Sequence, residues 1–493
     1  MRVSGSFSTP ATDNRRWLAL VVLCVAVLMV VLDQTIVNVA LPSIQGALGF
    51  SQSDLAWVVN AYLIAFGGLL LLAGRLGDMV GRKRIFVIGL AAFTIASLLC
   101  GVSWTPQMLV AARFIQGVGG AMSSAVALGM IVTMFPEPRD QARAIGVYSF
   151  VASAGASIGL LAGGVLTQAI SWHWIFFVNL PIGIVAALLA ARLLESDRGV
   201  GLGEGADVVG AVLVTAALML GVYTIVETSH YGWASSHTLG FGVLSIVLLA
   251  GFVVRQATAA NPLLPLRIFR SRNVSGANLV QVLMVAGMFG FFFLNTLYLR
   301  QVLGFRPLEI GLAFMPVALT IGALSLGLSA RVLTRFGARA VLLVGLTLMA
   351  AALAFVMRSP VHSSYPVDLL PVMILLGVGA GLSFPALMTL GMSGATPSDS
   401  GLASGLLNTT VQVGGAVGLA VLVTVAASRT GGLLASGQST AAALSGGYHL
   451  VYGIGVALLA VAIVMAAVLL RPEEATADVG EEPEQEADRS SAA

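Results

Sequence analysis

Charged residues are scarce in this sequence, and their scarcity narrows the class of protein. Asp, Glu, Lys and Arg together make up 10% of the 493 residues, whereas hydrophobic residues make up 58%. Soluble domains carry about 25% charged residues. A mean hydropathy of +0.96 and repeated apolar runs of about 18 residues or more are typical of a polytopic membrane protein. A soluble enzyme and a nucleic-acid-binding protein are therefore excluded.

Cysteine is also nearly absent, which excludes two further classes. The two cysteines, Cys24 and Cys100, each lie inside an apolar run. They have neither the spacing of metal ligands nor that of a disulfide framework. We therefore expect buried free thiols rather than a secreted disulfide scaffold, and we expect no metal site and no cofactor.

The apolar residues fall into fourteen windows that are long enough to span a membrane. These windows cover residues 17–39, 55–73, 85–103, 108–134, 144–169, 174–194, 207–227, 238–254, 274–299, 310–330, 340–357, 367–390, 402–426 and 449–470. The sequence thus predicts an all-α integral membrane protein with 14 transmembrane helices. We expect two six-helix bundles with two linker helices inserted between them, a 6+2+6 arrangement.

An internal repeat supports this division of the chain. The segment GRLGDMVGRK (74–83) aligns without gaps to ARVLTRFGAR (330–339), and each copy follows the second span of a six-span set. Bundles related by such a repeat place a substrate cavity at their interface near the middle of the membrane. The predicted units are an N-terminal bundle (1–195), a linker with two extra helices (196–272), a C-terminal bundle (273–472) and an acidic disordered cytoplasmic tail (473–493).

The distribution of basic residues predicts the orientation in the membrane. Most of the 25 lysines and arginines fall in the loops and tails on the side of the two termini. Cytoplasmic loops carry such an excess of positive charge, so both termini are predicted to be cytoplasmic.

Two ionisable residues lie in the middle of predicted spans. Asp33 is the acid so placed, in the first span, and Arg113 is the base, in the fourth. Ionisable groups inside the hydrocarbon region are costly and usually face a partner or a water-filled cavity. A carboxyl group that titrates with access to each side in turn is the minimum requirement for proton coupling. Proton or cation binding at Asp33 therefore stands beside a structural alternative, in which the amides of a helix break satisfy the carboxylate.

Polar and small residues form helix faces in three other spans. Arg113 and Gln116 share one face with two glycines, which suits either a cavity or a fixed ion pair. Asn408 and Gln412 lie on an uncharged face of the thirteenth span. We expect these two residues and Gln116 of the fourth span to line the substrate path. In the fifth span, glycines recur at the spacing that lets helix backbones approach closely; they are Gly155, Gly159 and Gly163, with Gly164 beside them.

Several segments resemble one family of transporters. GRLGDMVGRKR (74–84) resembles the signature loop between spans 2 and 3 of the major facilitator superfamily. LDQTIVNVALP (32–42) resembles the span 1 signature of its fourteen-span drug:proton antiporters, and GASIGLLAGG (155–164) is similar to their span 5 antiporter motif. Two further segments, 172–183 and 306–316, are similar to family landmarks, and the resemblance covers about residues 15–472.

This resemblance implies efflux of hydrophobic, often cationic, drugs or antibiotics, driven by inward proton flow with alternating access. On this chain it implies that Asp33 is the proton or cation site and that Arg113 assists proton transfer. It also implies a cytoplasmic gating latch made of Gly74, Asp78, Gly81, Arg82 and Lys83. Asp78 would accept bonds from an arginine and from the positive N-terminus of a helix in the other bundle. The expected partners are a small hydrophobic or cationic substrate, protons and the lipid bilayer, and the expected state is a monomer in a bacterial inner membrane.

Four positions depart from the family pattern. Leu160 stands where the span 5 motif has proline, and Met79 replaces the usual base after Asp78. Thr334 stands opposite Asp78 in the repeat, so only one bundle keeps the acid. His173 replaces an arginine between two tryptophans.

Other functions remain open at this point. A dedicated exporter of one endogenous metabolite, or a solute facilitator, has the same fold. An intramembrane enzyme or a membrane sensor finds no support, because the sequence has no HExxH motif and no paired intramembrane acids on opposing spans. We therefore expect a transporter and not an enzyme.

Overall fold

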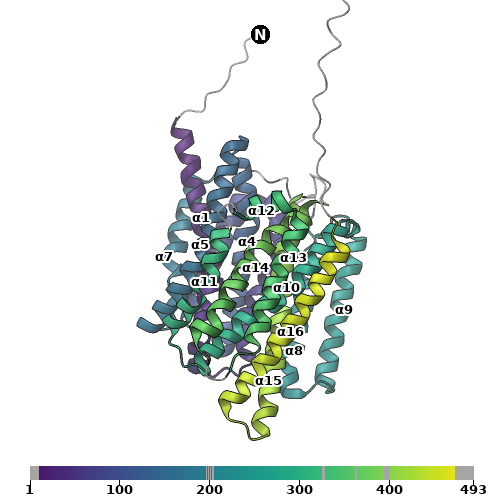
Figure 1. Ribbon diagram of the computed structural model, residues 1–493. Helices are drawn as coiled ribbons and strands as arrows, with labels where there is room; N and C mark the ends of the chain where they lie inside the picture. The colour runs from purple at the N-terminus through teal and green to yellow at the C-terminus, as the bar shows by residue number, and fades with distance from the viewer. Residues whose placement is uncertain are drawn as a thin grey trace, which may run out of the picture.

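The computed structural model describes residues 10–195, 197, 199, 201, 205–324, 328–360, 363–393 and 400–471, and these residues are helical with short connections (Figure 1). The predicted acidic tail (473–493) lies outside the described residues. The main helices are α1 (Pro10–Leu48), α2 (Trp57–Val80), α3 (Arg82–Gly101), α4 (Pro106–Met134), α5 (Pro138–Ala169), α6 (Trp174–Phe177), α7 (Asn179–Leu193), α8 (Val208–Tyr231), α9 (Ser236–Thr258), α10 (Arg272–Gln301), α11 (Pro307–Ala323), α12 (Ser329–Phe336), α13 (Ala338–Val356), α14 (Leu370–Ser393), α15 (Ser400–Ala435) and α16 (Thr440–Leu469). Short helical turns η1 (Asp54–Ala56), η3 (Leu266–Arg270) and η5 (Tyr365–Leu369) precede α2, α10 and α14.

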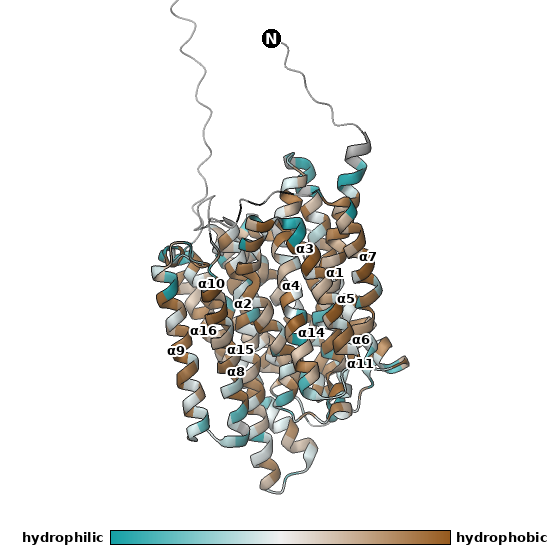
Figure 2. Cartoon of the chain, turned by 180° about the vertical axis from the view of Figure 1, so that it is seen from behind, coloured by the Kyte–Doolittle hydropathy of each residue, from teal (hydrophilic) through white to brown (hydrophobic). Residues whose placement is uncertain are grey.

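Within the described residues, thirteen helices are long and apolar enough to cross a membrane. They coincide with thirteen of the fourteen predicted windows. The remaining window, 310–330, falls on α11, which has 17 residues and is followed by residues outside the described ranges. A span perpendicular to the membrane needs about 20 residues, so α11 is slightly short. Figure 2 shows the hydrophobic residues along the length of the helices, as expected for helices that face lipid.

Helices pack mainly within two groups along the chain. In the first helix group (α1–α7), α1 packs on α5 and α7, and α4 packs on α2 and α3. In the second helix group (α10–α16), α10 packs on α15 and α16, and α13 packs on α14 and α16. Helix α8 packs on α9, α2 and α15, whereas α9 lies at the edge of the bundle in both views (Figures 1 and 2). The groups meet where α5 packs on α11 and where α2 packs on α15.

The two copies of the sequence repeat have the same backbone geometry. Gly81, between α2 and α3, has a φ of 111°, and Gly337, between α12 and α13, has a φ of 78°. Positive φ angles are costly for residues with a Cβ atom, so the shared glycine allows the same sharp turn in both places.

Between described residues, the hydrogen bonds that join the two groups lie at one end of the bundle. We call the end where α1 begins and α16 ends the terminal end, and the opposite end the far end (Figure 1). At the far end, Gln301 Nε2 donates to Gln45 Oε1 at 3.0 Å, and the backbone N–H of Leu308 donates to Gln168 Oε1 at 3.2 Å. At the terminal end, Asn273 Oδ1 accepts the backbone N–H of Arg471, which belongs to the same group, at 2.9 Å.

The last two helices are longer than the hydropathy windows predict. The windows end at residue 426 and resume at 449, but α15 continues to Ala435 and α16 begins at Thr440. The hairpin between them projects beyond the other helices at the far end (Figure 1). Its residues are too polar for a hydropathy window, but they include many alanines, which favour a helix. Ser439 Oγ caps α16 by accepting the backbone N–H of Ala442.

Candidate functional site

Asp33 lies in the middle of α1 and is completely buried. Helix α1 is continuous from Pro10 to Leu48, so no helix break supplies free amides to the carboxylate. Its partners are side chains of other helices instead. Arg113 of α4 donates from Nη1 to Asp33 Oδ2 at 2.5 Å, and Asn179 of α7 donates from Nδ2 to Asp33 Oδ1 at 3.1 Å.

Gln116 links the acid to the base. It lies one turn after Arg113 on α4, and its Nε2 donates to Asp33 Oδ1 at 2.7 Å while its Oε1 accepts from Arg113 Nη1 at 2.6 Å. Its Nε2 also donates to Ser97 Oγ of α3 at 2.8 Å. The predicted shared face of α4 therefore points at the first helix, and the sequence-predicted residues Asp33, Arg113 and Gln116 lie in one hydrogen-bonded network.

Arg113 has further partners that fix its position. Its Nε donates to the carbonyl oxygen of Val58, in the first turn of α2, at 2.9 Å. Its guanidinium lies over the ring of Tyr62, 4.4 Å from the centroid, and 5.9 Å from the ring centroid of Phe176. A cation over an aromatic face is attracted by the ring quadrupole, more strongly when water is excluded.

The network is closed to solvent in this structure. The side chain of Arg113 is 2% exposed and that of Asp33 is 0% exposed. Asp33 accepts hydrogen bonds from three N–H donors, as a carboxylate does. Burial of a charge is costly without a partner, and here each charge has one. The guanidinium of Arg113 lies against the carboxylate of Asp33, which is a group that can bind a proton.

The predicted gating loop is bonded inside the first helix group. Arg82 donates from Nη2 to Asp78 Oδ1 at 2.9 Å, and its Nη1 donates to the Gly129 carbonyl of α4 at 3.2 Å. Lys83 Nζ donates to the carbonyl of Leu194, after α7, at 2.7 Å. Within the described part of the chain, Asp78 has its arginine partner in its own loop and none in the other helix group. Gly74 and Gly81 lie on either side of this acid, and Gly81 makes the turn described above.

The glycines of α5 allow two close helix contacts. A Cβ atom at Gly155 would lie 3.1 Å from Leu28 of α1, and one at Gly163 would lie 2.7 Å from the Ile36 carbonyl oxygen. Gly159 lies between them, against Thr35. Gly164 faces the other way, where a Cβ atom would lie 2.8 Å from Leu308 Cα, at the start of α11. The predicted small-residue stripe therefore packs α5 against α1, and its last glycine packs against the second helix group. Helix α5 continues through Leu160 to Ala169.

The predicted substrate-path residues of α15 differ in their surroundings. Gln412 is 8% exposed, its Oε1 has no hydrogen-bond partner among the described residues, and its Cβ atom lies against Gly67 of α2. Asn408 is exposed and donates from Nδ2 to the Ser404 carbonyl of its own helix. Neither residue touches the Asp33 network through a hydrogen bond between described atoms.

Sequence reasoning missed three neutral polar residues of this region. Asn179 and Ser97 bond to the network, and Asn60, on α2, is fully buried with both side-chain polar atoms unpaired. Each lies inside an apolar window of the sequence. A polar side chain in that position could have been recognised, because a buried polar group needs a hydrogen-bond partner.

Solved structures of two transporters share this fold. A bacterial homologue of the human lysosomal transporter Spinster, in an inward-facing and unoccupied conformation, matches with a TM-score of 0.66 at 17% identity, over 93% of this chain and 97% of that one. A nucleoside transporter also matches with a TM-score of 0.66 at 12% identity, over 92% of this chain and all of that one. These two likenesses show the overall fold, an all-helical membrane fold.

The sequence comparison then gives the family. Residues 23–419 match the model of the Major Facilitator Superfamily, and the chain belongs to this family. It is 39% identical to the puromycin resistance protein of Streptomyces alboniger, over 94% of this chain and 93% of that protein. It is also 39% identical to the cephamycin export protein of Amycolatopsis lactamdurans, over 90% of this chain and 91% of that protein. The relatives are antibiotic resistance and export transporters, and the protein is a transporter rather than an enzyme.

Proposed function

We propose that this protein is a proton-coupled antiporter that exports hydrophobic or cationic drugs or antibiotics by alternating access. The observation that carries the proposal is the buried pair of Asp33 and Arg113, because it is an acid and a base held in contact in the middle of membrane-spanning helices. The relatives named for resistance to puromycin and for export of cephamycin support an antibiotic as the substrate.

The geometry suggests how a proton would act. When a proton neutralises Asp33, the attraction between carboxylate and guanidinium is lost, while Arg113 stays positively charged. Arg113 then keeps its bonds to the Val58 carbonyl and to Gln116 Oε1. The contact between α1 and α4 is weakened in this way, and it re-forms when the proton leaves. A cationic substrate competes with the proton for the same carboxylate.

The positions of the contacts between the helix groups support alternating access. Among the described residues, the hydrogen bonds between α1–α7 and α10–α16 lie at the far end, as in a conformation closed on that side. We propose that the termini are cytoplasmic, so that this state faces inward. We also propose that α11 completes a set of fourteen spans with a 6+2+6 arrangement, divided at residues 195, 272 and 472 as the sequence predicts.

The gating loop takes its role in the opposite state. In this structure Asp78 is paired with Arg82, and both side chains are partly exposed. We propose that the loop, with Lys83 and its glycines, contacts the second helix group when the terminal end closes. We further propose that the protein functions as a monomer in a bacterial inner membrane. Its substrate path would include Gln116, Asn408 and Gln412.

The driving force is sufficient for export. One charge that crosses about 100 mV contributes about 2.3 kcal/mol, and about 1.4 kcal/mol corresponds to a tenfold gradient, so one proton per cycle sustains roughly a fortyfold gradient of a neutral compound. Exchange of one proton for one monovalent cation is electroneutral and uses the pH gradient alone.

The test is transport of ethidium, a hydrophobic cation, in proteoliposomes with an imposed pH gradient. We expect Asp33→Asn to abolish gradient-driven accumulation, because the amide cannot release a proton. Asp140→Asn is the matched control, since Asp140 lies in the first turn of α5, outside the network. Circular dichroism and size-exclusion profiles show whether each variant is folded.

Counterflow without a gradient separates coupling from transport. A folded Asp33→Asn protein that exchanges ethidium but no longer accumulates it supports proton coupling at this residue. Undiminished accumulation in that variant contradicts the assignment of Asp33. Wild-type flux that is equal with and without the gradient contradicts antiport and favours a facilitator.

A further inference from the structure

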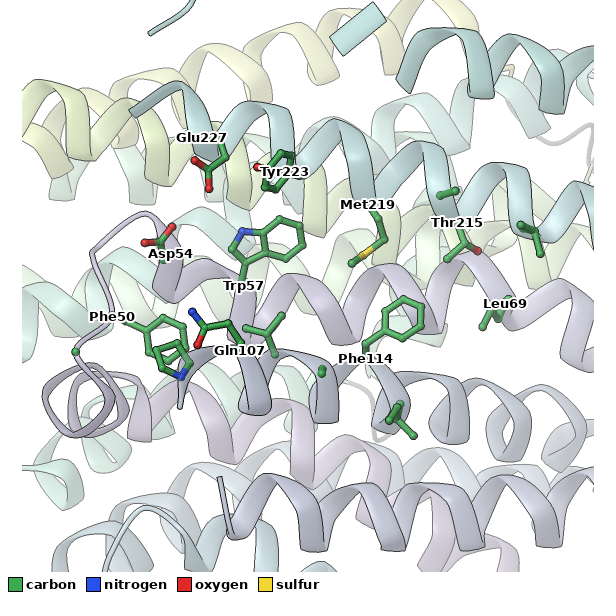
Figure 3. A pocket seen from close by; sticks show the side chains of 17 residues that line it. Phe50, Asp54, Trp57, Leu69, Gln107, Phe114, Thr215, Met219, Tyr223 and Glu227 are labelled. Atoms are coloured by element: carbon green, nitrogen blue, oxygen red, sulfur yellow. The ribbon is translucent and has the colours of Figure 1, made fainter. Parts of the chain in front are cut away.

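A second site lies outside the Asp33 network, between the inserted helix α8 and the first helix group. A pocket of about 1140 Å³ is lined by residues of α2, α4, α8 and the segment that joins α1 to α2. Drug-sized ligands occupy pockets of about 300–1,000 Å³, so this pocket has room for a larger molecule. Figure 3 shows the two carboxylates, Asp54 and Glu227, at one end of the pocket and Leu69 toward the other.

One end of the pocket carries two carboxylates. Asp54 and Glu227 lie at this end, beside the indole of Trp57 (Figure 3). Asp54 Oδ2 accepts a hydrogen bond from Ser51 at 2.7 Å and lies 3.7 Å from His230 Nε2. Glu227 has no hydrogen bond or ion pair with the described part of the chain. This end of the pocket therefore carries two acidic side chains, and the imidazole of His230 lies beside one of them.

The rest of the pocket is mainly apolar, with Thr215 among its lining residues, and part of its wall is exposed. Its length is lined by side chains such as Met219, Phe114 and Leu69, which lie progressively further from the acids in Figure 3. Glu227 and Val212, both at the pocket, are 15 residues apart on α8, which corresponds to about 22 Å of helix at about 1.5 Å per residue. One leaflet contributes about half of a hydrocarbon core of about 30 Å. Val212 is 58% exposed and Ile115 is 44% exposed, so the wall is incomplete on the side that faces lipid.

We propose that this pocket binds one phospholipid of the phosphatidylethanolamine type. Its ammonium group meets the carboxylates of Asp54 and Glu227, and its phosphate lies near the imidazole of His230 and the amide of Gln107. Its acyl chains follow the apolar wall toward the middle of the membrane. Tryptophan and tyrosine are enriched at headgroup level, and Trp57 and Tyr223 lie at the polar end of the pocket.

Such a lipid has a structural consequence for the inserted pair of helices. Helix α8 packs on α2, α15 and α9, and the pocket occupies the space between α8 and α4. A bound lipid fills this space and thereby fixes the inserted pair against the first helix group. The site is independent of the proposed proton site, since none of its lining residues belongs to the Asp33 network.

Native mass spectrometry of the full-length protein with added dioleoyl lipids tests the proposal. We expect one tightly retained phosphatidylethanolamine, with weaker retention of phosphatidylcholine, whose ammonium cannot donate hydrogen bonds, and the weakest retention of anionic phosphatidylglycerol. The double variant D54N/E227Q should lower phosphatidylethanolamine retention about fivefold or more, as loss of partly exposed charge contacts predicts. Ala216→Trp, which fills the pocket, should remove the bound lipid while leaving both carboxylates, Asp54 and Glu227, in place.

Matched controls separate this site from lipid bound anywhere on the surface. Asp140→Asn removes an acid from the opposite end of the bundle, and Ile246→Trp adds an indole at a position of α9 that is 67% exposed. Both should retain the lipid as the wild type does. Equal retention of phosphatidylglycerol and phosphatidylethanolamine by the wild type overturns the proposal, and so does full retention by both D54N/E227Q and Ala216→Trp. Asp33→Asn should retain the lipid whether or not it transports, so this result is separate from the test of antiport.

Discussion

Asp197 Oδ2 accepts a hydrogen bond from the backbone N–H of Arg82 at 2.8 Å, across 115 residues of sequence. Its Oδ1 accepts the next backbone N–H, that of Lys83, at 3.3 Å. The first N–H groups of a helix have no partner within that helix, and a nearby negative charge also interacts favourably with the helix dipole. The segment that follows α7 therefore caps α3 at the gating loop.

This contact predicts a stability effect of Asp197→Ala. Loss of the cap should lower the free energy of unfolding by about 1 kcal/mol, which a thermal unfolding scan in detergent can detect. Glu195→Ala is the matched control, because Glu195 is an exposed acid in the same segment. Equal melting temperatures of both variants and the wild type would show that the cap has no energetic weight.

The repeat predicts unequal roles for Asp78 and its counterpart. Asp78→Asn breaks the ion pair with Arg82 and should lower the rate of ethidium transport several-fold. Thr334→Asp adds an acid to the repeat copy, where Thr334 only donates to the Arg331 carbonyl within its own helix, and should change transport less. Equal and negligible effects of the two substitutions would remove the gating role of the loop.

The buried pair predicts strong coupling between two substitutions. Arg113→Gln leaves the Asp33 carboxylate buried without a counter-charge, which should cost about 3–5 kcal/mol of stability. Adding Asp33→Asn to that variant removes the uncompensated charge, so part of the lost stability should return. Melting temperatures of the two single variants and of the double variant measure this coupling. Strictly additive losses would contradict a direct electrostatic pair.

Two glycines on α5 provide a matched test of helix packing. Gly159→Ala places a methyl group against Thr35 and 3.0 Å from the Leu32 carbonyl oxygen, so we expect a loss of about 1–3 kcal/mol from overpacking. Gly146→Ala meets nothing within 4 Å, and we expect it to be neutral or to stabilise the helix by about 1 kcal/mol. Thermal stability in detergent measures both. The same change for both glycines would mean that the α1–α5 contact tolerates a Cβ atom.

The carboxylate at the start of α8 predicts a pH-dependent contribution to stability. Burial raises the pKa of Asp207, but hydrogen bonds from the Gly210 N–H, Arg255 and Gln256 lower it more, and the net pKa lies below its ordinary value. The Gly210 N–H and Arg255 each donate at 2.9 Å, and Gln256 donates at 2.7 Å. A lowered pKa in the folded state gives stability that is present above the unfolded pKa of about 3.9 and is lost as the pH falls through the folded value.

Asp207→Asn should therefore lower the free energy of unfolding by about 1 kcal/mol. The resulting drop in melting temperature should be the same at every pH from 8 to 5. The difference from the wild type should narrow only below about pH 4. Glu195→Gln serves as the control. A difference that already narrows between pH 7 and pH 5 would contradict the lowered pKa.

The sequence predicts the membrane-spanning helices, and it singles out the two residues that form the central pair, for identifiable physical reasons. Thirteen windows coincide with helices able to cross a membrane, because a long apolar run has few other stable structures. Asp33 and Arg113 were recognisable because ionisable residues are costly in hydrocarbon. Asn179 and Ser97 were missed because neutral polar residues in an apolar window carry a weaker signal than a charge.

Other features depend on tertiary packing and could not be predicted from local pattern. The pocket beside α8 arises from the way α8 packs on α2 while leaving space next to α4. Its two acids, Asp54 and Glu227, lie near the ends of separate windows, where charge is ordinary. The extension of α15 and α16 past their windows likewise reflects helix propensity without hydrophobicity.

The hydrogen bond from Arg113 Nε to the Val58 carbonyl connects the buried pair of Asp33 and Arg113 to helix α2. Val58 belongs to the first turn of α2, and α2 is the helix of the first group that rests on α15. In the proposed mechanism, a shift of the guanidinium moves the first turn of α2, the helix that packs on α15 of the second helix group. If Asp33 takes up protons as proposed, the carbonyl of Val58 is the atom through which its protonation would act on the contact between the two helix groups.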